Sequence, residues 1–451
     1  MTTLAYRRLL IILIALGSWV SGYSRQYSDS LLQYLEIAAK NNPAVQQKFT
    51  EYQAALQRIP QVGSLSDPEL SLGIFLKPME LVSGNQMADI KLMQMFPWFG
   101  VLKNARDEMS LMANAKFELF RDAKLQVFYD VQRTWYELYK VQKNISISEK
   151  NIEILKVIER LALVKFKSGP SASSGTTSSG NAMPSGSTQT TSMGSSPGGS
   201  GLADLYRIQI ETGELENNIA LLKNQEQSIV ARFNSYLNRP PAAPVFTDDT
   251  LKIDSSGLSM IAVTDSILAR NPMLTMVEFE KQSFEARKKM VNGMGYPMVG
   301  LGLNYSLINK SMMSASEMNG KDMIMPMLTV TLPIYRKKYN AMKTEADLLK
   351  SAASQNYRAI ANSLQTEYYE AIQLYQDAQR RIKLYENQYQ LASRSLDLIM
   401  KSFSTSSAGL TDVLRIRQQT LDYELKQVEA VADFNTAVAW LNRLMAISQI
   451  Q

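Results

Sequence analysis

Residues 298–307 read Met298-Val-Gly-Leu-Gly-Leu-Asn-Tyr-Ser-Leu307, so that Val, Leu, Leu, Tyr and Leu alternate with Met, Gly, Gly, Asn and Ser. Successive side chains of a strand point to opposite faces. The alternation therefore predicts a strand with one apolar face and one face of mostly small or polar groups. Residues 69–76 alternate in the same way. Each segment has about ten residues, the length of a tilted strand that crosses a bilayer.

Two further segments, near Ile90–Phe96 and Ile324–Leu332, are expected to return beside the first two, although their alternation is less regular. Four strands leave two unpaired edges, and lipid does not tolerate an unpaired edge. Several chains must therefore share one closed barrel, and three protomers would supply twelve strands. Aromatic residues after each return strand suit a membrane–water interface. These are Phe96, Trp98, Phe99, Tyr335 and Tyr339.

The remaining sequence predicts long helices. Apolar or small residues recur in alternating steps of four and three from Leu364 to Phe403, and again from Val413 to Leu444. A sustained spacing of 3.5 residues is typical of a left-handed coiled coil. We expect each half of the chain to open with a helical stretch, at about 30–61 and 263–291. Two strands and then two long helices joined by a turn follow in each half.

Landmarks repeated in the same order predict an internal duplication. Asn42-Pro43 recurs as Asn271-Pro272, and Leu202-Ala-Asp-Leu205 recurs as Leu410-Thr-Asp-Val413. The predicted divisions are a first repeat at 23–245, a linker at 246–256 and a second repeat at 257–447. Residues 168–200 are a flexible insertion rich in Gly and Ser, with Met, at the first helix turn.

The first residues resemble an export signal. Arg7 and Arg8 precede the apolar run Leu9–Leu16, and small residues follow. This order predicts a secretory signal peptide over 1–22, with a short membrane anchor as the alternative. Because no later run has about 18 apolar residues, the mature chain is expected to have no transmembrane helix.

Composition excludes several functions. The chain has no Cys and no His, so disulfides, zinc–thiolate sites and His-based catalysis are impossible. The net charge is +6 over 451 residues, and the basic residues are interleaved with acidic ones, which does not indicate nucleic-acid binding. We therefore expect neither an enzyme nor a bound cofactor.

The order helix, strand, strand, long helix, turn, helix, given twice, resembles the TolC family of outer-membrane factors. The Asn-Pro landmarks and the turn at 408–414 carry the resemblance, which covers essentially the whole mature chain. It implies a mainly α chain with a small membrane β-barrel, four strands per chain, and a long periplasmic coiled-coil tunnel. It implies a homotrimer in the cell outer membrane, in contact with its lipid, that passively conducts substrates. A periplasmic membrane-fusion adaptor and an inner-membrane pump of RND type would be its partners.

By this resemblance, the two helix turns form a periplasmic tip. Gly201 and Leu202 belong to one adaptor-docking turn, and Gly409 and Leu410 belong to the other. A multidrug or type I secretion duct of the same fold remains an alternative. A secreted coiled-coil adhesin or structural protein is an alternative of another class, and the alternating strands argue against it.

The same resemblance assigns a gate at the tip. Asp204 and Asp412 match an acidic position at which a ring of carboxylates would favour cations. Arg415 stands where relatives often carry a second aspartate, so the chain departs from the family pattern here. The alternative for each aspartate is a helix N-cap.

Methionine suggests a cargo. The chain has 24 Met, and several lie where the alternation points away from lipid. Thioether sulfur is a soft ligand that suits Cu(I) or Ag(I). Met93, Met95, Met325 and Met327 are therefore candidate metal ligands, in a duct that resembles the CusC/CzcC heavy-metal branch. The alternative is that Met is a flexible apolar filler.

Overall fold

The computed structural model describes residues 31–167, 200–247, 251, 267, 269–405 and 409–447. The predicted signal peptide over 1–22 lies outside these ranges, as do almost all of the 168–200 insertion and most of the 246–256 linker. The described elements, in chain order, are α2 (Leu31–Asn41), α3 (Pro43–Gly63), β1 (Glu69–Leu81), β2 (Gly84–Phe96), α4 (Val101–Lys167), α5 (Ser200–Tyr236), α7 (Pro272–Met294), β3 (Met298–Asn309), β4 (Met323–Thr331), α8 (Arg336–Ser404) and α9 (Leu410–Leu444).

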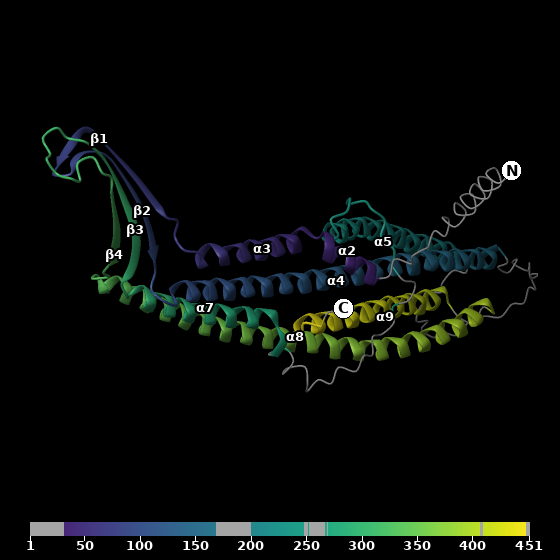
Figure 1. The fold of residues 1–451 in the computed structure, drawn as a ribbon. Coiled ribbons are helices and arrows are strands. Elements are labelled where there is room, and N and C mark those ends of the chain that lie inside the picture. Colours follow the sequence, from purple (N-terminus) through teal and green to yellow (C-terminus); the bar gives the residue numbers. More distant parts are fainter. Residues whose placement is uncertain are drawn as a thin grey trace, which may run out of the picture.

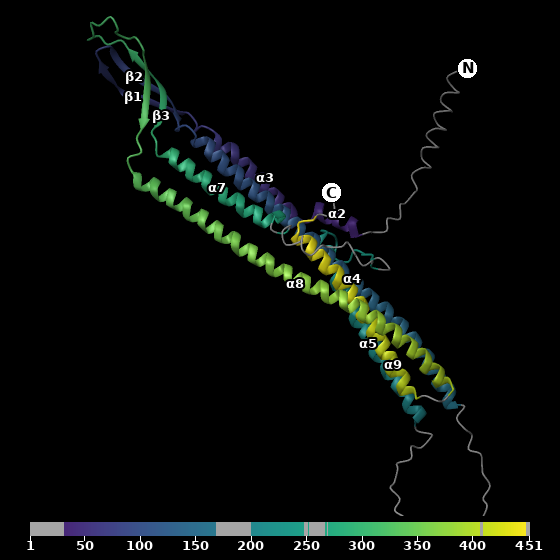
Figure 2. The same ribbon diagram turned by 90° about the horizontal axis from the view of Figure 1, so that it is seen from below.

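The molecule is elongated, with the sheet at one end and the end of α4, the start of α5, the end of α8 and the start of α9 at the other (Figures 1 and 2). The helices are mostly parallel or antiparallel to the long axis between these ends. The mainly helical fold with four strands per chain is as predicted. Among the described residues, no helix is long and apolar enough to cross a membrane.

Each half contains one very long helix and two shorter partners. Helix α4 has 67 residues and α8 has 69, so each spans roughly 100 Å at 1.5 Å per residue. Helices α3 and α5 pack on α4, while α7 and α9 pack on α8. Each half has the two long helices that were expected, and the returning helices α5 and α9, with 37 and 35 residues, are about half the length of α4 and α8.

The repeated Asn-Pro pairs mark the junctions between the shorter helices. The helical stretch expected over 30–61 consists of two helices, because the chain breaks at Asn42 and restarts with Pro43 at the first helical position. The Asn42 Oδ1 accepts from the backbone of Ala44 at 2.9 Å, and its Nδ2 donates to the Tyr236 carbonyl at the end of α5 at 2.8 Å. One buried side chain thus caps α3 and holds the end of α5.

Asn271 makes the same pair of contacts in the second half. Its Oδ1 accepts from the backbone of Met273 at 3.0 Å, and its Nδ2 donates to the Leu444 carbonyl at the end of α9 at 3.3 Å. Both asparagines are buried. This repeated device supports the predicted duplication, while the predicted divisions at 23–245 and 257–447 stay predictions.

The sheet is a four-stranded antiparallel meander in the order β1-β2-β3-β4. Strand β2 begins at Gly84, earlier than the predicted 90–96 segment, because Asn85, Gln86, Ala88 and Asp89 also pair with both neighbours. Bulges at Ile74/Met79 and Gln86/Ala88 interrupt the ladder far from the helices. Between Glu69 and Ile74 the register is regular, so opposite residues share a face.

The main core lies between the helices, at the predicted seams. In the first half it is centred on Val131, Trp135 and Leu138, which are almost completely buried. In the second half, Leu364, Tyr368 and Ala371 pack with Leu441 and Leu444. The seam residues predicted in the second half are therefore buried between helices, while the coiled coil itself stays a prediction.

Candidate functional site: the two-faced sheet and the hairpin tip

One face of the sheet is aliphatic and exposed. The register places Leu72 opposite Ile90, Leu92 opposite Leu303, and Leu301 opposite Leu328. The exposed side chains on this face are Leu70, Leu72, Ile74, Ile90, Leu92, Leu301, Leu303, Leu328 and Val330. A continuous exposed apolar surface of this kind needs an apolar partner, and lipid is the partner that suits a sheet of this length.

The opposite face carries polar groups, glycines and the methionines. Ser71, Lys91 and Asn304 share one row across the strands, and Asp89 and Ser306 share the next. The methionines on this face are Met93, Met95, Met298, Met323, Met325 and Met327. The structure thus places the four predicted metal ligands on the face opposite the aliphatic one.

The two outer strands leave the described sheet open. Strand β1 pairs only with β2, and β4 pairs only with β3, so each has one edge without partners among the described residues. Exposed strand edges recruit further strands. The edges and the aliphatic face together make this sheet incomplete as an isolated membrane element.

A stripe of exposed leucines on α8 was not singled out from the sequence. Leu384, Leu391 and Leu398 recur every seven residues and are 46%, 65% and 66% exposed. They lie off the predicted buried seam that includes Ala378 and Ile382. The heptad spacing was visible in the sequence, but only the packing shows that no described helix of the same chain covers this stripe.

At the tip, the Leu410 side chain is buried and is not accessible to a partner protein. It is 3% exposed and packs with Val413, Ile208 and Leu155, so α4, α5 and α9 share one small core there. Leu202, in contrast, is 46% exposed. Gly409 is the exposed residue that precedes α9. Gly201 lies in the first turn of α5.

The gate candidates lie close to this core. Asp412 is in the first turn of α9 and pairs with Arg415 at 3.3 Å, and both side chains are more than half exposed. The N-cap of α9 is Gly409, so the N-cap interpretation of Asp412 is wrong. Asp204 lies inside α5, four residues after its first residue. Arg207 on α5 donates to the Thr411 hydroxyl at 2.7 Å and links the two turns.

A buried charge lies two helical turns after the start of α9, and it was not predicted from the sequence. Arg417 on α9 is 3% exposed and donates to the Asn151 side chain and, at 3.0 Å, to its carbonyl on α4. Burial lowers the pKa of Arg417, and the nearby Glu211 and Glu424 oppose that shift. Burial raises the pKa of both glutamates, against the attraction of the guanidinium.

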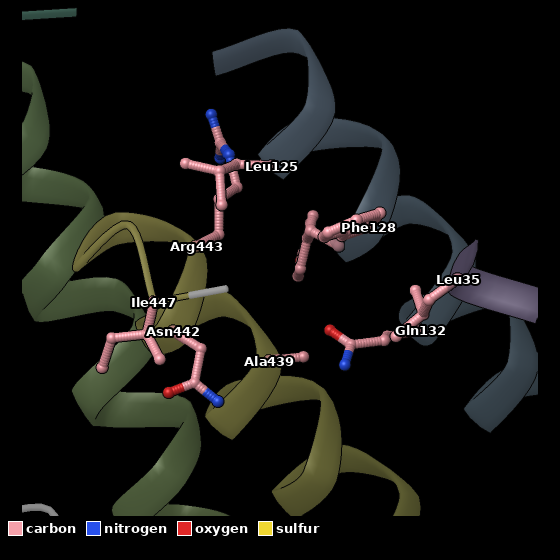
Figure 3. A pocket seen from close by; sticks show the side chains of 9 residues that line it. Leu35, Leu125, Phe128, Gln132, Ala439, Asn442, Arg443 and Ile447 are labelled. Atoms are coloured by element: carbon pink, nitrogen blue, oxygen red, sulfur yellow. The ribbon is translucent and has the colours of Figure 1, made fainter. Parts of the chain in front are cut away.

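The pocket where α2, α4 and α9 meet is too small for a substrate (Figure 3). Leu35, Phe128, Ala439 and Arg443 are among its lining residues, and its cavity volume is about 10 Å³, which is near the size of one water. Across the described residues, no group of three or more Asp or Glu is placed to hold a metal ion. The candidate metal ligands that remain are the thioether sulfurs on the sheet.

Compared by sequence, the chain matches no protein-family model and no curated protein. Solved structures nevertheless resemble it over nearly its whole length. A membrane protein from Pseudomonas aeruginosa matches with a TM-score of 0.71 at 14% identity, covering 93% of this chain and 93% of that chain. The outer membrane protein VceC from Vibrio cholerae matches with a TM-score of 0.70 at 13% identity, covering 94% and 98%.

CusC, whose crystal structures concern folding and transmembrane channel formation, matches with a TM-score of 0.69 at 14% identity, covering 93% of this chain and 92% of that chain. At these identities the likeness is one of fold. The chain therefore has the fold of outer-membrane channel proteins, with a four-stranded sheet and long helices.

Proposed function

We propose that the chain is one protomer of a homotrimeric TolC-type efflux duct in the outer membrane. The observation that carries this proposal is the sheet: one face is aliphatic and exposed, the other is polar and sulfur-rich, and both edges lack described partners. Three such sheets joined edge to edge would form a closed barrel with lipid outside and water inside. The fold likeness to outer-membrane channels supports the same function.

The helices would then form the periplasmic tunnel. The leucine stripe on α8 would pack against the next protomer, because an exposed apolar stripe at heptad spacing needs a helical partner. The hairpin turns would dock a membrane-fusion adaptor, which in turn meets an inner-membrane pump of RND type. Exposed Leu202 and the Gly409 backbone are the parts of the predicted tip that a partner reaches, while Leu410 holds the turn in shape.

The cargo we propose is a soft cation, Cu(I) or Ag(I), moved without a reaction. The methionines on the polar face supply thioether donors along the inside of the barrel. At the tip, Asp204 and Asp412 would contribute negative charge, although the Asp412 carboxylate is partly neutralised by Arg415. The preference of the tip for cations is therefore weaker than it would be if both carboxylates of each protomer were unpaired.

A tolerance assay tests the proposal. The chain is expressed in a strain that lacks its own outer-membrane duct, together with the cognate adaptor and pump. We expect restored growth in silver or copper. Restored tolerance to a detergent or dye but not to metal would retain the duct and reject the metal cargo. Failure to restore any tolerance, with assembled trimer in the outer membrane, would reject the duct.

A further inference from the structure

The glycines of β3 make room for methionine sulfur on the polar face. A Cβ atom built on Gly300 would lie 2.5 Å from the Met95 Sδ and 3.2 Å from the Met93 Sδ. A Cβ on Gly302 would lie 3.1 Å from the Met93 Sδ. Two thioethers from one strand thus converge on the space that the absent side chain of Gly300 leaves open.

A third thioether approaches from the other side. Met93 and Met327 face Gly302 from opposite sides, in the same row and on the same face of the sheet. Strand β3 separates Met93 from Met327, so the two positions lie about 10 Å apart, twice the spacing of neighbouring strands. Each is within about 5 Å of the glycine between them, and the three rotatable bonds of Met let its sulfur reach over that glycine. Met93 is 7% exposed, so its sulfur lies under neighbouring atoms and not in open solvent.

We infer that Met93, Met95 and Met327 form a three-thioether site for Cu(I) or Ag(I) over Gly300 and Gly302. This deepens the proposed function, on which it rests only for the statement that the site faces the inside of a barrel. Three neutral sulfurs suit a soft monovalent ion and do not suit Mg²⁺ or Ca²⁺. Glu69 pairs with Met93 in the site's own row and Lys91 shares the face one row away, so charges of both signs flank the site and the sulfurs supply the preference for a soft ion.

Met325 is not part of this site. It lies opposite Asn304, one row beyond Gly302, and is 46% exposed. Met323 follows one row further, opposite Ser306. These two methionines would receive the ion after it leaves the three-thioether site. The four predicted ligands therefore divide into Met93, Met95 and Met327 within the site's rows, and Met325 beyond them.

Direct Ag(I) binding to the purified trimer tests the site. The chain has no Cys, so methionine is its source of sulfur ligands, and it has no His to supply a nitrogen ligand. We expect one tightly held Ag(I) per protomer in chloride-free buffer, with a sulfur-only first shell by X-ray absorption. Met93→Leu, Met95→Leu and Met327→Leu combined should weaken binding at least tenfold. The Met312→Leu/Met313→Leu variant, which alters two exposed loop methionines, should bind as the wild type does.

A glycine pair gives a control that removes no sulfur. Gly300→Ala should displace both sulfurs and weaken Ag(I) binding at least tenfold, because its new Cβ would meet them at less than or near 3 Å. Gly73→Ala on β1, whose Cβ would meet nothing closer than 3.7 Å, should leave binding unchanged. Heat-modifiable migration must show intact trimer for every variant compared.

The outcomes separate this inference from the duct. A wild-type trimer that restores drug tolerance but binds no Ag(I) would reject the site and keep the duct. Binding that survives the triple leucine change, or that is lost with the loop methionines, would also reject the site. Tight Ag(I) binding to a protein that restores no tolerance would keep the site and reject the duct.

Discussion

Arg417 shows how a single residue joins the two halves near the tip. Its guanidinium lies on α9 but donates to Asn151 on α4, so a residue of the second half holds a helix of the first. Its Nη1 has no hydrogen-bond partner among the described residues. Glu211 on α5 and Glu424 on α9 supply the negative charge around it. Burial costs both carboxylates more than the guanidinium returns, because the pKa of each is raised.

Two of these groups give the tip region a defined pH dependence. Burial raises the pKa of Glu211 and Glu424 in the folded chain. A raised folded-state pKa stabilises the fold below the ordinary glutamate pKa of about 4.5, and that contribution is lost as the pH rises through the raised value. The two glutamates therefore favour the folded state more at pH 5 than at pH 7.

We predict that Glu211→Gln/Glu424→Gln raises the thermal unfolding midpoint at pH 7 by on the order of 1 °C, since the shift per kcal/mol falls as the chain lengthens. The gain should shrink toward pH 5, because the wild-type glutamates then approach neutrality. Circular dichroism melts of the detergent-solubilised protein at a fixed scan rate measure this. Glu216→Gln, an exposed change on α5, is the control. An equal gap between wild type and variant at pH 5 and pH 7 would contradict the prediction.

At the scale of elements, α8 has two seams with different partners. The first packs within the chain on α9 through residues such as Ala378 and Ile382. The second is the stripe of Leu384, Leu391 and Leu398, which no described helix of the same chain covers. Burying one leucine side chain contributes about 1.5–3 kcal/mol, so a threefold assembly that covers the stripe gains substantial stability from it.

We predict that Leu391→Glu shifts the detergent-extracted protein from trimer toward monomer. The change places a charge at the centre of the stripe, where a neighbouring helix would have to desolvate it. Native mass spectrometry measures the distribution of oligomers. Gln390→Glu adds the same charge at an exposed position outside the stripe and should leave the trimer intact. Equal trimer content in both variants would show that the stripe is not an interface.

The sequence predicted the faces of the sheet because a period of two is readable without knowing any partner. It predicted the buried seams for the same reason, since a period of 3.5 marks one side of a helix. The sequence did not predict features that depend on contacts with neighbouring helices. These features are the break at Asn42, the burial of Leu410 and the contact of Arg417 with Asn151. The row that unites Met93, Gly302 and Met327 likewise depends on register.

For the whole molecule, the proposed assembly depends on the two outer strands. The edges of β1 and β4 that lack described partners lie at opposite sides of one sheet. Pairing β4 of one protomer with β1 of the next would remove every free edge in a ring of three. The absence of cysteine from the chain makes this arrangement easy to probe, because introduced thiols are then the sole sites for thiol cross-linkers.

We predict that Ser71→Cys on β1, combined in turn with cysteine at positions 325, 327, 329 and 331 on β4, gives covalent trimers in at least one combination. A short bis-maleimide applied to intact outer membranes, followed by denaturing electrophoresis, detects them. Each single-cysteine variant should stay monomeric on the gel. Leu92→Cys/Leu303→Cys, an opposed pair within the sheet, should cross-link without forming oligomers. Monomers in all four β1/β4 combinations would argue against edge pairing.

Methionine is confined to one face of the regularly paired sheet, so that face is the one sensitive to oxidation of thioethers. Peroxide or hypochlorite converts thioether to sulfoxide, which is polar and no longer a soft donor. The aliphatic face, built on Leu, Ile and Val, has no such chemistry at its paired positions. Oxidative stress would therefore alter the sulfur side of the wall while sparing the side that contacts hydrocarbon, and a sulfoxide reductase would be needed to restore it.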